Sequence, residues 1–304
     1  MYRVPFLGGN GGDSTGGSLD TALLVDPNLQ SVVDQPDWER PYARASMEYV
    51  DCVALRERDA PVADWATTTG GAYRFLGVTD PESLGSLRQT AITRYETSFA
   101  QSQLLAGTGA YAAGPVDERG LDSEYTADDP DTRIEGHGVY SFETHGKLGV
   151  SDTGLAFARP WNYIDEELEE ATDAAYEQFA TGLLRRSIAR AKEGPTPPDW
   201  LAAALERLGS YQYATFDLRS AAGPNPDRIF ARSFDVQGTE TSLQVLMATP
   251  KASNFEQVWD PSGVERQFRQ WPDASPSLDV GDRIGVATAT VPTEDTALAN
   301  EPGV

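Results

Sequence analysis

The only two histidines of the chain lie eight residues apart, and each has an acidic residue close by. His137 follows Glu135, and His145 follows Glu143. Two histidines and one carboxylate are a common ligand set for zinc or iron, so His137, His145 and Glu135 are the candidate metal ligands. Glycines surround all three, and their spacing matches no usual ligand pattern on a strand or a helix. We therefore favour the alternative, in which both histidines lie on a β-ribbon or its turns and bind no metal.

No other catalytic or cofactor-binding motif is complete in the sequence. The glycine-rich stretch 8–17 lacks the Gly-Lys-Ser or Gly-Lys-Thr of a phosphate-binding loop. The single cysteine, Cys52, excludes an internal disulfide and has no catalytic partner. The acidic stretch 122–131 lacks the glycine and glutamate of a calcium loop. We expect no cofactor and no enzymatic activity, while paired carboxylates for carbohydrate binding or hydrolysis stay open in a chain with 47 acids.

The charge of the chain is typical of a protein that works in molar salt. It has 47 acidic residues against 24 basic ones, a net charge of −23, and all but three of the basic residues are arginines. Arginine is more weakly hydrated than lysine and pairs with carboxylates through a planar fork. At about 1 M salt the Debye length falls to about 3 Å, which suppresses self-repulsion. The composition indicates a halophilic organism or its virus, the alternative being an acidic protein that binds cations or basic partners.

The composition also limits the partners. The sequence has no cluster of Lys and Arg large enough to form a nucleic-acid-binding face, and no apolar segment long enough to span a membrane. Its first residues do not resemble a secretory signal peptide. With 39% hydrophobic residues the chain can bury a core. We therefore expect a globular protein in the cytoplasm, or packaged from it, that binds neither nucleic acid nor a membrane directly.

The elements that would position these residues fall into four regions. Residues 1–45 are predicted to be a flexible N-terminal arm, and residues 46–106 strands followed by a helix from Asp80 to about Gly107. Residues 107–160 are an extended acidic loop and β-ribbon, with strands at 139–142, 147–150 and 155–158. Residues 161–304 are a long helix and a mixed α/β domain.

The long helix is the clearest expected element. It runs from about Tyr163 to Glu193, with acidic residues in its first turns and basic residues in its last, as the helix dipole favours. Gly194 and Pro195 end it. After it we expect helices at 198–208 and around 254–259, and strands at 211–219, 229–236, 242–248 and 283–291.

The order of these elements resembles a known architecture. The segment from Lys147-Leu148-Gly149-Val150-Ser151, through Asn162-Tyr163-Ile164-Asp165-Glu166-Glu167, to Arg190 is similar to the major capsid protein fold of tailed viruses, shared with encapsulins. In that family a two-stranded extended loop, here about 107–159, leads into a spine helix, and subunits overlap arms and loops to close a shell. Residues 46–106 are longer than that pattern, and the part after the helix is shorter.

The resemblance implies a role in assembly. It implies contacts between subunits through the arm, including Phe6 and Leu7, and through the arginine-rich helix end at Arg185, Arg186 and Arg190. The partners would be further copies of the chain and other virion proteins. The sequence thus predicts an α+β fold with a spine-like helix, a β-ribbon extended loop, an N-terminal arm and a mixed α/β remainder. The predicted function is a structural protein of a haloarchaeal virion, assembled in the host cytoplasm and most simply a capsid subunit. A neck, tail or baseplate component, or a halophilic enzyme or carbohydrate-binding module, are the alternatives.

Overall fold

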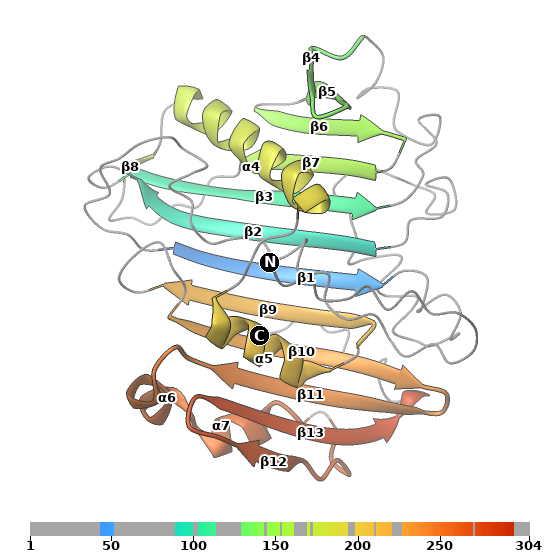
Figure 1. Ribbon diagram of the computed structural model, residues 1–304, viewed down its shortest axis with the longest axis vertical. Helices are drawn as coiled ribbons and strands as arrows, with labels where there is room; N and C mark the ends of the chain where they lie inside the picture. The colour runs from blue at the N-terminus through green and yellow to red at the C-terminus, as the bar shows by residue number, and fades with distance from the viewer. Residues whose placement is uncertain are drawn as a thin grey trace.

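A computed structural model describes twelve stretches of the chain. These are residues 43–51, 89–99, 103–113, 129–142, 145–152, 154–160, 169–170, 173–193, 198–209, 211–220, 227–269 and 271–294. They form a sheet with helices packed on it (Figure 1).

The sheet has 13 strands, and strand β1 lies near its middle. The order is β12-β13-β11-β10-β9-β1-β2-β3-β7-β6-β5-β4, and every neighbouring pair along it is antiparallel. The short strand β8 adds to β3 in parallel. The strands are β1 (Ala43–Asp51), β2 (Gln89–Phe99), β3 (Gln103–Ala113), β4 (Thr132–Ile134), β5 (His137–Phe142), β6 (Gly146–Ser151), β7 (Gly154–Pro160), β8 (Glu169–Glu170), β9 (Tyr213–Ser220), β10 (Arg228–Gln237), β11 (Glu240–Ala248), β12 (Ser277–Val280) and β13 (Ile284–Pro292).

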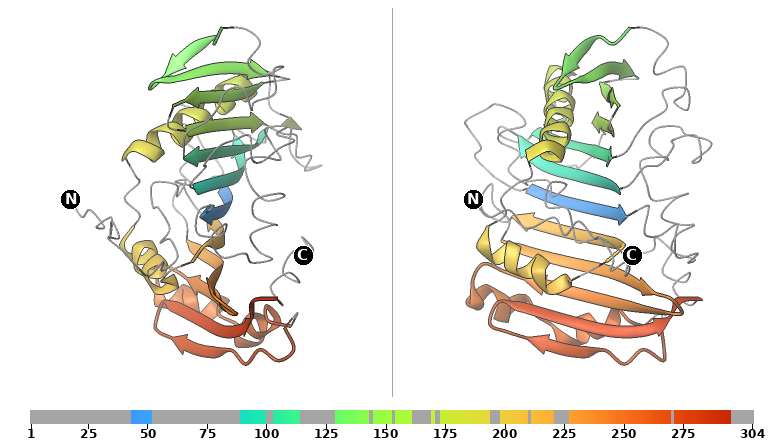
Figure 2. Two further views of the ribbon diagram at one scale, coloured as in Figure 1. Left: turned by 90° about the vertical axis from the view of Figure 1, so that its right-hand side faces the viewer. Right: turned by 45° about the vertical axis from the view of Figure 1, so that its right-hand side comes forward.

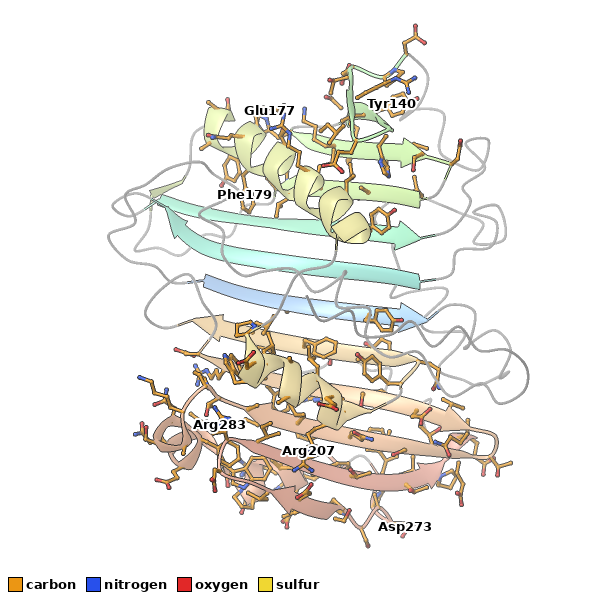
Figure 3. The ribbon with its side chains drawn as sticks, in the orientation of Figure 1. Tyr140, Glu177, Phe179, Arg207, Asp273 and Arg283 are labelled. Carbon is orange, nitrogen blue, oxygen red and sulfur yellow. The ribbon has the colours of Figure 1, made fainter. Side chains whose placement is uncertain are left out.

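Helices α4 (Asp173–Glu193) and α5 (Asp199–Leu208) cover one face of this sheet, which we call the near face (Figure 2). The register explains why both helices share it. Tyr49 of β1 stands opposite Ala91 of β2 and Ala214 of β9, and the residues packed under α4 and α5 have the same parity, so they lie on one face of the sheet. The α4 residues Phe179, Leu183 and Ile188 are buried in this core, and Figure 3 labels Phe179.

The opposite face, which we call the far face, is apolar at its two ends. At the C-terminal end it packs against α7 (Pro261–Arg266) and the turn after it, through Val264, Phe268 and Trp271; α6 (Ala252–Val258) precedes α7. At the other end Phe142 stacks on Phe157, with ring centroids 5.4 Å apart. The strands between these ends carry charged residues on this face.

The predicted α+β fold with a spine helix is wrong, because the described chain is mostly antiparallel sheet. The long helix begins at Asp173 instead of Tyr163, and Glu169 and Glu170 form strand β8. Acidic residues four apart, such as Asp165 with Glu169 and Glu166 with Glu170, repel one another on a helix, which disfavours the predicted first turns.

Two further predictions are wrong for related reasons. The expected helix from Asp80 to Gly107 is contradicted by strands β2 and β3. Threonines at 90, 93 and 97 and Ile92 are β-branched and favour a strand, and β2 is paired on both sides. The β-ribbon does not project as an extended loop, because β7 pairs with β3 and brings the ribbon strands into the main sheet.

Many individual elements are confirmed. The three ribbon strands appear as β5, β6 and β7, and the later strands as β9, β10, β11 and β13. The helices expected at 198–208 and near 254–259 are α5 and α6. The N-terminal arm lies outside the described residues apart from its last three positions, which start β1. In the described part, no helix has the length and apolar character needed to cross a membrane.

Candidate functional site

His137 is a buried residue of β5. Its side chain lies on the near face, where Nε2 is 3.0 Å from Oγ of Ser151 and the ring meets Tyr111 edge-on at 6.3 Å. Ser151 Oγ also donates to the carbonyl of Gly154 at 3.2 Å. Because the Ser151 hydroxyl donates its proton to the Gly154 carbonyl, it does not donate it to His137. The Ser151–His137 pair is therefore a packing contact within the β5–β7 ribbon and not a nucleophile with its base.

His145 lies in the turn between β5 and β6 and meets a different set of residues. Its backbone is left-handed, with φ of 66°. Nδ1 is 3.3 Å from Oε2 of Glu177, Nε2 is 3.6 Å from Oδ1 of Asp173, and the ring stacks on Tyr176, all three on the first turns of α4. Glu135 is exposed in the β4–β5 turn. Among the described residues, which include all three candidates, no group of three or more His, Cys, Asp or Glu is arranged to hold a metal ion.

Lys147 completes the contact between the hairpin and the helix. Its Nζ forms an ion pair with Oε1 of Glu177 and donates to Oγ of Ser141 at 2.9 Å. Partial burial works to raise the pKa of Glu177, but the hydrogen bond and charge of Lys147, with a smaller effect of His145, outweigh it, so this pKa lies below its ordinary value. The cluster fixes α4 to the ribbon (Figure 3).

The residues predicted to mediate assembly are only partly described. Arg185 is exposed on α4, while Arg186 and Arg190 lie on the same helix with side chains outside the described part. Phe6 and Leu7 lie outside the described residues.

The structure brings together another set of arginines, which the sequence patterns did not single out. Arg44 of β1 stands directly opposite Arg219 of β9, and Arg219 stands opposite Arg228 of β10. Opposed residues in neighbouring strands share a face, so three arginines form one row across three strands. At a strand spacing of about 4.8 Å the row spans about 10 Å.

Two adjacent rows on the same face add three more arginines. The second row lies two positions further along the strands. In it Arg94 of β2 pairs with Thr108 of β3, and Thr108 pairs with Arg159 of β7. Arg232 lies four residues beyond Arg228 on β10. All six positions have the opposite parity to Tyr49 and therefore lie on the far face. We call this set the arginine face: Arg44, Arg94, Arg159, Arg219, Arg228 and Arg232.

The arginine face has the opposite charge to the rest of the molecule. Glu48, Glu96 and Asp217 are the acidic residues in these rows on the same strands, which gives 6 − 3 = +3 for the patch. The whole chain has a net charge of −23. A cationic area within so acidic a protein attracts anionic groups and repels other cations.

Three of these arginines have described side-chain environments. Arg159 and Arg232 are exposed, and the guanidinium of Arg232 lies 5.6 Å over the ring of Phe230 and donates to Oε1 of Gln267. Nε of Arg228 is buried without a hydrogen-bond partner. A guanidinium has five N–H donors in a fixed fork that matches carboxylate and phosphate groups, so the exposed side chains of Arg159 and Arg232 suit an anionic ligand.

Sequence reasoning missed this face because its arginines lie far apart in the chain. Residues 44, 94, 159, 219 and 228 become neighbours only through strand pairing. The available signal was the alternation along each strand. In β1, for example, the polar residues Arg44, Ser46 and Glu48 alternate with residues of the near face. The helix predicted through Arg94 hid this pattern.

Comparison with known proteins adds little. No protein-family model and no curated protein matches the chain. Two crystal structures of TP0453 are similar at low levels: crystal form I, with 11% identity, 91% of this chain and 97% of that chain covered, and a TM-score of 0.38, and crystal form IV, with 11% identity, 84% and 91% covered, and a TM-score of 0.39. At such values the likeness carries no argument about function.

Proposed function

We propose that this protein is a non-catalytic assembly protein that docks a carboxylate-rich surface of another protein through its arginine face. The observation that carries the proposal is the row Arg44–Arg219–Arg228, in which like charges stand directly opposite one another in adjacent strands and one carboxylate, that of Glu96 opposite Arg44, faces three arginines. Such pairs destabilise a sheet. A partner that supplies carboxylates relieves the repulsion and uses the fork geometry of arginine.

A protein partner fits better than a long polyanion such as nucleic acid. The patch is small, and the chain around it has a net charge of −23, which repels an extended polyanion on all sides. Phosphate contacts also weaken steeply as salt rises. Short-range bidentate pairs with carboxylates are screened less, because their atoms lie closer together than the Debye length of about 3 Å at 1 M salt.

The kind of assembly is proposed from composition alone. We propose a haloarchaeal virion, in which this protein could belong to the neck, the tail or the baseplate as well as to the shell. The spine helix and projecting ribbon that suggested a shell-forming capsid subunit are not present in the described chain, so the fold lends that assignment no support.

Binding of labelled poly-L-glutamate in about 1 M KCl, followed by fluorescence anisotropy, tests the proposal. The double variant Arg44→Glu, Arg228→Glu should weaken binding at least about tenfold. The matched control Arg185→Glu, Arg283→Glu changes the net charge equally at exposed positions, one on near-face helix α4 and one in the turn before β13, and should change binding less than about twofold. The milder pair Arg44→Gln, Arg228→Gln is used if the reversal prevents folding.

Three results would overturn the proposal: no binding by the natural chain, equal loss in both variants, or tighter binding of a single-stranded oligonucleotide than of poly-L-glutamate. The last result would assign the face to a phosphate polymer.

A further inference from the structure

Among the described strands, β12 forms one end of the sheet and pairs with β13 alone. All four of its residues are exposed. Leu278 is 43% exposed and Val280 48% exposed, and in the described part of the chain they are the exposed large hydrophobic residues. An exposed edge strand that carries large apolar side chains is a template for pairing with another strand.

No strand of the described chain bonds to the outer side of this edge. The N–H of Gly281 donates to the carbonyl of Ile284 at 2.9 Å, which makes these two residues a hydrogen-bonded pair of the β12–β13 ladder. Antiparallel ladders alternate, so Asp279 also directs its backbone groups toward β13. The N–H and C=O groups of Leu278 and Val280 therefore point away from β13.

The charge that would normally protect such an edge is neutralised. Asp279 lies on the near face, between the two apolar residues in sequence, and its carboxylate forms an ion pair with Arg207 of α5; Arg207 is labelled in Figure 3. A charged residue on an edge strand usually discourages pairing with another strand. Here the charge is already matched within the chain.

We propose that β12 pairs with β12 of a second copy of this chain, antiparallel and about a two-fold axis perpendicular to the sheet. Such an axis keeps each face on its own side, so only residues of equal parity can stand opposite one another. In the best register Leu278 stands opposite Val280 of the second copy, and Val280 opposite Leu278. These two pairs use the free backbone groups and form four hydrogen bonds.

The other registers are worse for identifiable reasons. A shift that places Leu278 opposite its own counterpart puts Pro276, which has no N–H, opposite Val280. A shift the other way sets Leu278 opposite Asp282. In the chosen register Asp279 stands opposite Asp279 of the second copy, a like-charge pair whose repulsion is reduced because each carboxylate is paired with its own Arg207. The pairing is independent of the arginine face and could persist without it.

Cysteine cross-linking tests both the pairing and the register, in the full chain with Cys52→Ser. At the axis the two Asp279 residues form a non-hydrogen-bonded pair with Cα atoms about 4.5 Å apart, which a disulfide can bridge. Asp279→Cys should cross-link on mild oxidation to a species of 2 × 32.9 = 65.8 kDa. Leu278→Cys, the matched control, lies diagonally from its counterpart at about 8 Å and should remain largely uncross-linked.

Sedimentation in about 3 M KCl provides a second measurement. The natural chain should show a concentration-dependent dimer, Leu278→Asp should be monomeric, and Thr290→Asp, an exposed position of β13, should behave as the natural chain does. The proposal is overturned by a natural chain that stays monomeric, by a Leu278→Asp variant that still dimerises, or by cross-linking of the Leu278→Cys variant without cross-linking of the Asp279→Cys variant.

Discussion

The packing of α4 on β3 can be tested at Gly107. A Cβ at this position would lie 2.7 Å from Cε1 of Phe179, 3.1 Å from Cδ1 of Leu183 and 3.1 Å from the carbonyl oxygen of Arg159. Favourable carbon contacts are about 3.5–4.0 Å, so the helix would have to move by close to 1 Å at Phe179. Overpacking of this kind costs about 1–3 kcal/mol, and we expect Gly107→Ala to lose that much stability.

A double-mutant cycle assigns the loss to the ring. Phe179 is wholly buried, and Phe179→Leu shortens the side chain where the new methyl group would clash. We expect the two changes together to cost less than the sum of their separate costs, with a coupling of about 0.5–2 kcal/mol. Recovery is incomplete, because the Arg159 carbonyl does not move with the ring. Urea unfolding in about 3 M KCl, followed by circular dichroism, measures each free energy.

Gly149→Ala is the matched control, since its Cβ would meet nothing nearer than 3.4 Å beneath the same helix. A Gly107→Ala protein as stable as the natural chain, or strictly additive costs, would refute the placement of α4 over β3. A large loss in Gly149→Ala would point to a general intolerance of these strands instead.

Two other predictions concern polar groups. Gln212 is wholly buried, donates to Oδ1 of Asp235 at 2.8 Å and accepts a hydrogen bond from the N–H of Val236. Gln212→Ala should therefore lower the free energy of unfolding by about 1–3 kcal/mol for each buried group that loses its partner. Gln237→Ala, at an exposed position that also bonds Asp235, is the control and should lower the melting temperature less. The pKa of Glu177 is lowered in the folded chain, so its contribution is present above the ordinary value of 4.5 and is lost as pH falls through the lower, folded value. The Tm advantage of the natural chain over Glu177→Gln should therefore disappear in acid; an advantage unchanged by pH would contradict this.

The sequence predicts local elements well where two signals coincide. The strands at 139–142, 147–150 and 155–158 combine alternating apolar residues with glycine-containing turns, and all three are present. Residues 89–99 show the opposite case. Ala91, Tyr95 and Phe99 fit a helical stripe, but Thr93 and Thr97 complete an equally good alternation, and pairing with β1 and β3 decides between them.

Long-range pairing also explains what the sequence could not predict about the site. His137 and His145 are close in sequence, yet each is held by residues remote from it, Tyr111 in one case and the first turns of α4 in the other. The arginine face requires the pairing of β9 with both β1 and β10, across gaps of more than a hundred residues on one side. Neither strand order nor register can be predicted from periodicity, because the alternation of one strand is compatible with pairing to several other strands.

The two proposed surfaces should respond differently to salt. At about 1 M the Debye length of about 3 Å is shorter than the strand spacing of about 4.8 Å, so repulsion along the row of Arg44, Arg219 and Arg228 is damped while direct contacts with carboxylates persist. The proposed β12 pairing should respond in the other direction, since excluded salts strengthen the burial of Leu278 and Val280 and leave backbone hydrogen bonds in place. Raising the salt further should therefore weaken binding at the arginine face while it favours the β12 dimer. Opposite salt trends in the anisotropy and sedimentation measurements are the result expected if the two surfaces act separately, and parallel trends would mean that one of the two assignments is wrong.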